Sequence, residues 1–151
     1  MDVYEVRAVF SPELNQEDYA NLLVGDMGFT YHDLKIDILD IDHIDISMCS
    51  CPAGEDLHYH VMLLNYYVDL IIETIDKRKV CFQIINDSAI EDIFRWLKNK
   101  KINYQDKINI EEIFSCYKDT LTRYNFIRRN FRIWAQKFNL DNPRKFNNRK
   151  Y

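Results

Sequence analysis

The sequence predicts an α+β domain with a central antiparallel sheet, flanking helices and a helical C-terminal extension. Segments in which apolar and polar residues alternate, such as residues 3–10, recur in the first half of the chain and are typical of strands. Apolar residues at helical spacing dominate from residue 89 onward. The chain has 151 residues, 47% of them hydrophobic and 29% charged, so it can bury one core and is too apolar for a disordered chain.

The N-terminal part is expected to contain strands and one helix. Residues 3–10 alternate as a strand does. Asn15 can cap a helix that runs to about Met27 and ends at the glycine that follows. Residues 33–45 alternate again, which predicts one or two further strands.

The middle of the chain is expected to form a hairpin, a helix and another strand. Residues 44–51 and 57–64 are predicted to pair as antiparallel strands across a turn at residues 52–54. Residues 66–76 have helical spacing, and residues 79–85 are again β-like.

The last third of the chain is predicted to be helical. A polar cap cluster at residues 86–88 precedes an amphipathic helix over residues 89–100. Two more helices, separate or continuous, are expected over residues 110–125 and 126–138.

No linker or repeat divides the sequence, so we expect one compact domain. Within it, residues 1–105 form the α+β part, residues 106–140 the helical extension, and residues 141–151 a flexible basic tail. The formal net charge is −4, but positive charge gathers near the end of the chain. A basic end on an acidic protein suits contact with phosphates, and it equally suits a solvated helix face.

The cysteine content and hydropathy predict an intracellular protein, cytoplasmic or nuclear. The chain has four cysteines, no opening that resembles a signal peptide and no apolar run of membrane-spanning length. We therefore expect no membrane partner, and free thiols or metal ligands rather than disulfides. The abundance of Ile, Asn, Lys and Tyr hints at an AT-rich genome, such as that of a virus, a mobile element or a low-GC bacterium.

Two pairs of potential metal ligands are spaced two residues apart in the predicted hairpin. His58 and His60 would project to one face of their strand, and Cys49 and Cys51 to one face of the preceding strand. Imidazoles and thiolates are ligands for divalent metals, so the hairpin could hold one ion of Zn, Mn or Mg. The alternative is an ordinary hairpin with surface histidines and buried cysteines.

The segment His58-Tyr59-His60-Val61-Met62-Leu63-Leu64 is similar to the His-hydrophobic-His strand of the HUH superfamily, the single-strand DNA nicking domains of rolling-circle replication initiators. The order of predicted elements over residues 3–100 is also similar to that of the family. The resemblance implies an HUH/ferredoxin-like fold. It also implies a divalent ion held by the histidine pair and an upstream ligand, at or near Cys49 or Cys51, and a nucleophilic tyrosine on the later helix.

The chain departs from the family at the nucleophile. The helix over residues 89–100 has no tyrosine, and Phe94 and Trp96 stand at the candidate positions. Neither side chain can attack phosphorus, so we assign no catalytic residue and treat nicking as an open question. Lys98 and Lys100 could still take the lysine role that the family often has near its nucleophile.

We interpret the later tyrosines and the two remaining histidines as structural or exposed residues rather than as parts of a site. Tyr104, Tyr117 and Tyr124 lie on later segments and could only serve as displaced nucleophiles. Tyr117 and Tyr124 are seven apart, which predicts core or interface positions on one helical face. His32 and His43 lie in the acidic strand region and are expected to be exposed.

The segment over residues 124–134 interleaves aromatic side chains with Arg128, Arg129 and Arg132. Such a pattern suits single-stranded nucleic acid, through stacking and phosphate contacts, and it also suits an ordinary amphipathic helix. We therefore expect a single-stranded DNA-binding domain similar to replication initiators, a degenerate HUH-type endonuclease. The alternative is a non-enzymatic protein that binds a protein partner, such as an immunity or accessory protein of a virus, phage or mobile element.

Overall fold

The computed structural model describes residues 4–11, 18–56 and 61–140. In this part the chain forms one eight-stranded sheet with the strand order β4-β3-β2-β1-β7-β6-β5-β8. The strands are β1 (Tyr4–Ser11), β2 (Asp18–Gly25), β3 (Gly28–Tyr31), β4 (Leu34–Asp37), β5 (Ile41–Asp56), β6 (Val61–Thr74), β7 (Lys79–Ile84) and β8 (Tyr104–Asp106). The helices are α1 (Ile90–Asn99), α2 (Ile110–Cys116) and α3 (Thr120–Phe138), and η1 (Ile38–Asp40) and η2 (Asp87–Ala89) are short 3-10 turns.

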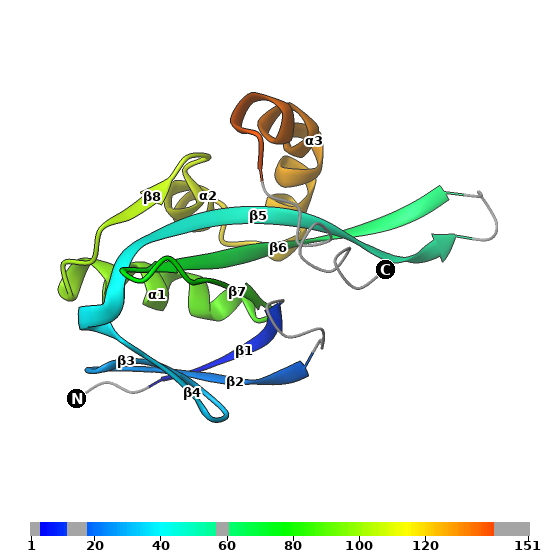
Figure 1. Ribbon diagram of the computed structural model, residues 1–151. Helices are drawn as coiled ribbons and strands as arrows, with labels where there is room; N and C mark the ends of the chain where they lie inside the picture. The colour runs from blue at the N-terminus through cyan, green and yellow to red at the C-terminus, as the bar shows by residue number, and fades with distance from the viewer. Residues whose placement is uncertain (1–3, 12–17, 57–60, 141–151) are drawn as a thin grey trace.

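Two antiparallel meanders make up the sheet. Strands β1 to β4 form the first, strands β5 to β7 form the second, and the pairing of β1 with β7 joins them. Strand β8 adds to the outer edge of β5 in parallel, so the sheet is mixed. The sheet is strongly curved, so the long strands β5 and β6 cross above β2 to β4 in Figure 1.

The core lies between the two meanders and α1. It includes Leu22 and Phe29 from the first meander, Ile44 and Phe82 from the second, and Trp96 from α1. The rings of Phe29 and Trp96 have centroids 4.8 Å apart, and the Trp96 Nε1 donates a hydrogen bond of 3.0 Å to the Gly25 carbonyl. The predicted α+β class with a C-terminal helix is confirmed. The predicted HUH/ferredoxin-like arrangement remains a prediction.

The strands predicted at residues 3–10, 44–51 and 79–85 are confirmed as β1, β5 and β7 in one sheet. The predicted partner at residues 57–64 is observed from Val61 onward, and residues 57–60 lie outside the described part. The turn predicted at residues 52–54 is wrong, because β5 continues to Asp56 and only shifts its register there. A bulge therefore stands where a turn was expected.

The helix predicted from Asn15 to Met27 is wrong, because residues 18–25 form β2. Long-range pairing decides this segment: Leu22 and Val24 are fully buried against the core, and the backbone pairs with β1 and β3. Gly28 does not end a helix but begins β3. Its φ is +134°, and a Cβ there would come within 2.0 Å of the Ile36 carbonyl oxygen, so the hairpin requires glycine.

The helix predicted over residues 66–76 is also wrong, because this segment belongs to β6. Strand β6 lies between β5 and β7, and residues 68–72 are all buried. A strand that is buried on both faces reads as a continuous apolar run, whose period does not distinguish it from a helix.

The predicted helix over residues 89–100 is confirmed as α1. The two later helices are present as α2 and α3, but the break falls at residues 117–119. Asp119 caps α3 by accepting a 2.8 Å hydrogen bond from the Thr122 N–H, which fixes the break at this point. Tyr117 therefore lies before α3, and the prediction that Tyr117 and Tyr124 share one helical face is wrong.

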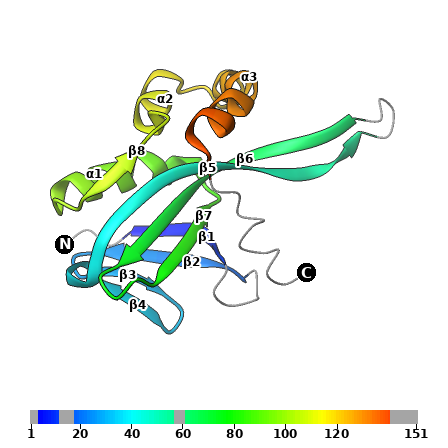
Figure 2. The ribbon, with the colours of Figure 1, turned by 45° about the horizontal axis from the view of Figure 1, so that its top comes forward.

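Helix α3 stands where the β5–β6 hairpin leaves the rest of the sheet (Figure 2). The Tyr124 hydroxyl of α3 donates a 2.8 Å hydrogen bond to the Leu64 carbonyl of β6. Beyond this point the two strands continue as a two-stranded arm, since β7 pairs with β6 only from Val68 to Glu73. Over the described ranges, no helix is both long and apolar enough to span a membrane.

Candidate functional site

The predicted metal ligands are only partly within the described residues. His58 and His60 lie outside them, and so does the side chain of Cys51. Cys49 is buried on β5, with 2% exposure. Its thiol donates to Asp69 Oδ1 at 3.5 Å and accepts a 3.0 Å hydrogen bond from Gln83 Nε2. A metal site built on these four residues therefore stays a prediction.

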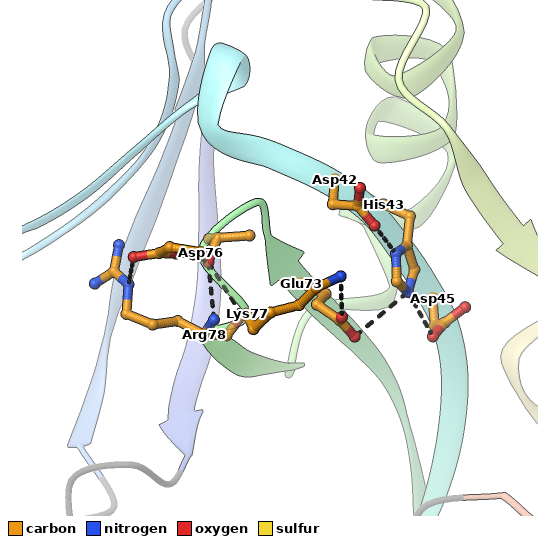
Figure 3. Close-up of polar contacts among 8 residues, drawn as sticks. Asp42, His43, Asp45, Glu73, Asp76, Lys77 and Arg78 are labelled. Atoms are coloured by element: carbon orange, nitrogen blue, oxygen red, sulfur yellow. Dashed lines mark hydrogen bonds and ion pairs between the residues drawn. The ribbon is translucent and has the colours of Figure 1, made fainter.

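The structure brings a different set of metal-type ligands together at the other end of the same hairpin. His43 near the start of β5 lies opposite Glu73 near the end of β6, and Asp42 precedes His43. One ligand atom from each of the three side chains lies within 4.8 Å of the other two. Figure 3 shows these side chains with Asp45 on the same part of the two strands.

The His43 ring faces carboxylates on both nitrogens. Its Nδ1 lies 2.7 Å from Asp42 Oδ2, and its Nε2 lies 3.7 Å from both Asp45 Oδ2 and Glu73 Oε2. With a proton on Nδ1, the ring donates to Asp42 and leaves the Nε2 lone pair facing the other two carboxylates. A carboxylate that orients a histidine in this way is the usual outer partner of a metal-bound imidazole. The hydrogen bond from His43 also lowers the pKa of Asp42.

Asp45 adds an unmet requirement to this cluster. Its Oδ1 is buried and has no hydrogen-bond partner among the residues that the structure describes. A buried carboxylate oxygen without a partner is costly, and a cation close by offsets that cost. The oxygen that faces His43 Nε2 is the other one, Oδ2, and a divalent ion or a proton there would supply positive charge to the same carboxylate. The imidazole and carboxylate donors suit Zn or Mn.

The turn between β6 and β7 adds a competing cation. Thr74 holds this turn, since its hydroxyl donates to Asp76 and accepts a 3.0 Å hydrogen bond from the Arg78 N–H. The turn places Lys77 Nζ 3.7 Å from Glu73 Oε1 (Figure 3). Lys77 is 74% exposed, so its ammonium can move away when another cation binds Glu73.

The residues predicted to bind nucleic acid lie at two helices, α1 and α3, and differ in their ion pairing. Lys98 and Lys100 at the end of α1 are paired with Glu111 and Asp26. Three of the four arginines of α3 are exposed, and none of these three forms an ion pair within residues 4–11, 18–56 and 61–140; they are Arg128, Arg129 and Arg132. Helix α3 contains no acidic residue, so the charged side chains on its outer face are all positive.

A cavity of about 230 Å³ opens beside this positive face. Its walls come from β6, α2 and α3, and its aromatic lining is Tyr66, Tyr67, Phe114 and Tyr124. The Tyr66 ring lies 5.6 Å from Tyr124 and 5.1 Å from Phe131, measured between centroids. Burial raises the pKa of Tyr66, the neighbouring Tyr124 adds to the rise, and the positive charge of Arg128 opposes it. The Tyr66 phenol is therefore protonated at neutral pH.

The inner end of the cavity is fixed by Arg123. Its guanidinium lies 2.8 Å from the Asp87 carboxylate, donates a 2.9 Å hydrogen bond to the Tyr117 carbonyl, and lies 4.4 Å from the centre of the Phe114 ring. These contacts tie α3 to α2 and to the turn before α1. The same contacts therefore hold the walls of the cavity in place in the folded protein.

Comparisons with known proteins give no relative. No family model matches the sequence, and neither the curated proteins nor the solved structures contain a match. The likeness to HUH initiators therefore depends on the sequence motif alone.

Sequence reasoning missed most of these site residues. His43 was expected to be an exposed residue, yet its side chain is 27% exposed and lies among carboxylates. Glu73 was missed because its strand, β6, was predicted to be a helix. The spacing of His43 and Asp45 could have indicated this cluster, because residues two apart on a strand face the same side.

Proposed function

We propose that the protein binds single-stranded DNA along α3, with phosphates on its arginines and bases against the aromatic side chains between α3 and β6. The observation that carries the proposal is the position of Arg128, Arg129 and Arg132, unpaired on a helix without acidic residues and next to the Tyr66–Tyr124–Phe131 cluster. Arginines supply the phosphate contacts, and aromatic rings supply the stacking surface that single strands use.

Charge and geometry both favour a single strand over a duplex. Stacking on protein rings requires bases that are not already stacked in a duplex. The net charge of −4 repels nucleic acid from the rest of the surface, so binding concentrates on α3. With about three phosphate contacts from these arginines, affinity should fall as salt rises with a log–log slope of about −2, roughly 0.7 per contact.

We do not propose that the protein cleaves DNA. Phe94 and Trp96, at the positions where the resemblance places the nucleophile, are buried in the core at 2% and 5% exposure. Tyr124 uses its hydroxyl to bind Leu64, and the raised pKa of Tyr66 disfavours the phenolate that an attack on phosphorus requires. The role supported best is a binder.

The test compares two triple variants with equal charge change. Fluorescence anisotropy with a labelled oligothymidylate of about 15 nucleotides measures affinity over a range of salt concentrations. In Arg128→Gln/Arg129→Gln/Arg132→Gln, we expect at least a tenfold loss and a log–log salt slope that is shallower by about 2, roughly 0.7 per lost phosphate contact. The control Arg7→Gln/Arg78→Gln/Arg95→Gln removes three exposed arginines elsewhere and should change affinity much less.

Two outcomes would overturn the proposal. Equal losses in both variants would show a net-charge effect rather than a site. Absence of binding by the wild type at low salt would favour the interaction-protein alternative. That alternative has its own support on α3, where Leu121 and Ile133 are 67% and 61% exposed.

We also propose that the cluster of Asp42, His43 and Glu73 binds one divalent ion, with Asp42 as the orienting carboxylate. Support comes from Asp45 Oδ2 and Glu73 Oε2, which both lie 3.7 Å from His43 Nε2. The ion would balance the carboxylate charge and fasten the start of β5 to the end of β6. Its experiment is described among the predictions below.

A further inference from the structure

We infer that the cavity between β6 and α3 is a pocket for a single unpaired base of the bound strand. The inference rests on the proposed DNA binding and adds to it a specific place for one base. It concerns the 230 Å³ cavity lined by Tyr66, Tyr67 and Tyr124, rather than the arginine face outside it.

The size of the cavity limits its occupant. Pockets for whole drug-sized molecules are about 300–1,000 Å³, so a cavity of 230 Å³ suits one ring system with the rest of the ligand outside. A nucleotide meets this description, because its flat base is the buried part and its sugar and phosphate remain in solvent.

The lining is suited to a neutral aromatic ring. Met48, Val68 and Ile127 form apolar walls, and the rings of Tyr66 and Tyr124 supply faces for stacking. The charged groups within it, Arg123 and Asp87, neutralise each other at 2.8 Å. An anionic group therefore gains little inside the cavity, and a base gains burial and stacking.

Polar groups at the cavity can bind the edge of a base. Asn65 is exposed, and its Nδ2 donates a 3.2 Å hydrogen bond to the Tyr67 hydroxyl, which leaves its carbonyl oxygen as an acceptor. The Tyr66 hydroxyl has no hydrogen-bond partner in the described part of the chain and is half-buried. It can therefore donate to a ring nitrogen or a carbonyl of the base.

The phosphate of the same nucleotide has a nearby partner. Arg128 is one helical turn after Tyr124 on α3, and its charge acts on Tyr66 at the cavity. A base in the cavity beside the Tyr66 ring would leave its phosphate near Arg128. The cavity and the arginine face thus bind two parts of one nucleotide.

The experiment separates the base from the backbone. Affinity is measured for an oligothymidylate and for an oligonucleotide of the same length made of abasic sites, which has the same charge. We expect the wild type to bind the oligothymidylate about tenfold more tightly. Tyr66→Leu should reduce this preference to about twofold or less and leave the abasic affinity unchanged, whereas Tyr66→Phe, which keeps the ring, should retain most of it.

The outcomes distinguish this inference from the function on which it rests. If the wild type binds both oligonucleotides equally and still depends on the three arginines, the phosphate contacts of the proposed function stand, and the base pocket is overturned together with stacking on these aromatic side chains. A preference that survives in Tyr66→Leu also overturns the pocket. If neither oligonucleotide binds, both the pocket and the proposed function are wrong.

Discussion

The Arg123 guanidinium lies 2.8 Å from the Asp87 carboxylate and joins α3 to the turn that precedes α1. The Arg123 side chain is 8% exposed, so the pair is largely shielded from water on the arginine side. The same guanidinium binds the Tyr117 carbonyl and lies over Phe114. One buried cation therefore determines how the C-terminal helix sits on the sheet, and with it the shape of the candidate site.

Removing this cation should destabilise the fold. We expect Arg123→Ala to lower the free energy of unfolding by about 1–3 kcal/mol, because it leaves the Tyr117 carbonyl without its partner and removes the packing on Phe114, while water can replace the arginine at the 44% exposed Asp87. Chemical denaturation of both proteins measures the difference. The control is Arg95→Ala on α1, whose arginine is 67% exposed and should matter by less than about 0.5 kcal/mol. Equal stability of both variants would contradict a structural role for Arg123.

The cap of α3 predicts a pH effect on stability. The backbone N–H and hydroxyl of Thr122 both hydrogen-bond to Asp119 and lower the pKa of its carboxyl in the folded state. The stabilisation is therefore complete above the unfolded pKa of about 3.9 and is lost as the pH falls through the lower folded value. We expect Asp119→Asn to melt below the wild type at neutral pH, and the two melting temperatures to converge in acid. A pH-independent gap would contradict this assignment.

The proposed cation site predicts metal-dependent stability. Adding Zn²⁺ or Mn²⁺ should raise the melting temperature of the wild type, since a ligand that binds only the folded state stabilises it. His43→Ala should abolish the shift, and Asp42→Asn should weaken the affinity by about 10–100-fold through loss of the orienting carboxylate. His32→Ala, in the turn between β3 and β4, is the matched control and should keep the shift.

The same measurement distinguishes the two candidate metal sites. A shift that persists in His43→Ala and disappears in His58→Ala/His60→Ala would place the ion at the predicted His-x-His strand. In that case the resemblance to HUH initiators would gain support, and the His43 cluster would be an ion pair that uses a proton instead.

The buried state of Phe94 and Trp96 predicts that α1 takes no part in DNA cleavage. Incubation with a labelled single-stranded oligonucleotide and Mn²⁺ should give no protein–DNA adduct that resists denaturant. A covalent adduct would refute this prediction, and Tyr104→Phe, Tyr117→Phe and Tyr124→Phe would then identify the nucleophile. Anisotropy under the same conditions shows whether the DNA was bound at all.

Elements with a local sequence pattern could be assigned before the structure was known. Helix α1 has one apolar face against a polar one, which only a period of 3.6 produces, and its predicted bounds were right within one residue at each end. The arginines of α3 were also recognisable, because neighbours on one helix face follow from spacing alone. Strand β1 alternates clearly enough to be assigned without its partners.

Segments whose conformation depends on distant partners could not be assigned from sequence patterns. Strand β6 resembles a helix in sequence because β5 and β7 flank it and both of its faces are buried, so no alternation remains. The same holds for the sites. His43 meets Glu73 only through the register of β5 and β6, and Tyr66 meets Tyr124 only because Arg123 and the Tyr124 hydroxyl fix α3 against β6. Contacts between residues far apart in the chain depend on the free energy of the whole fold, which no local pattern contains.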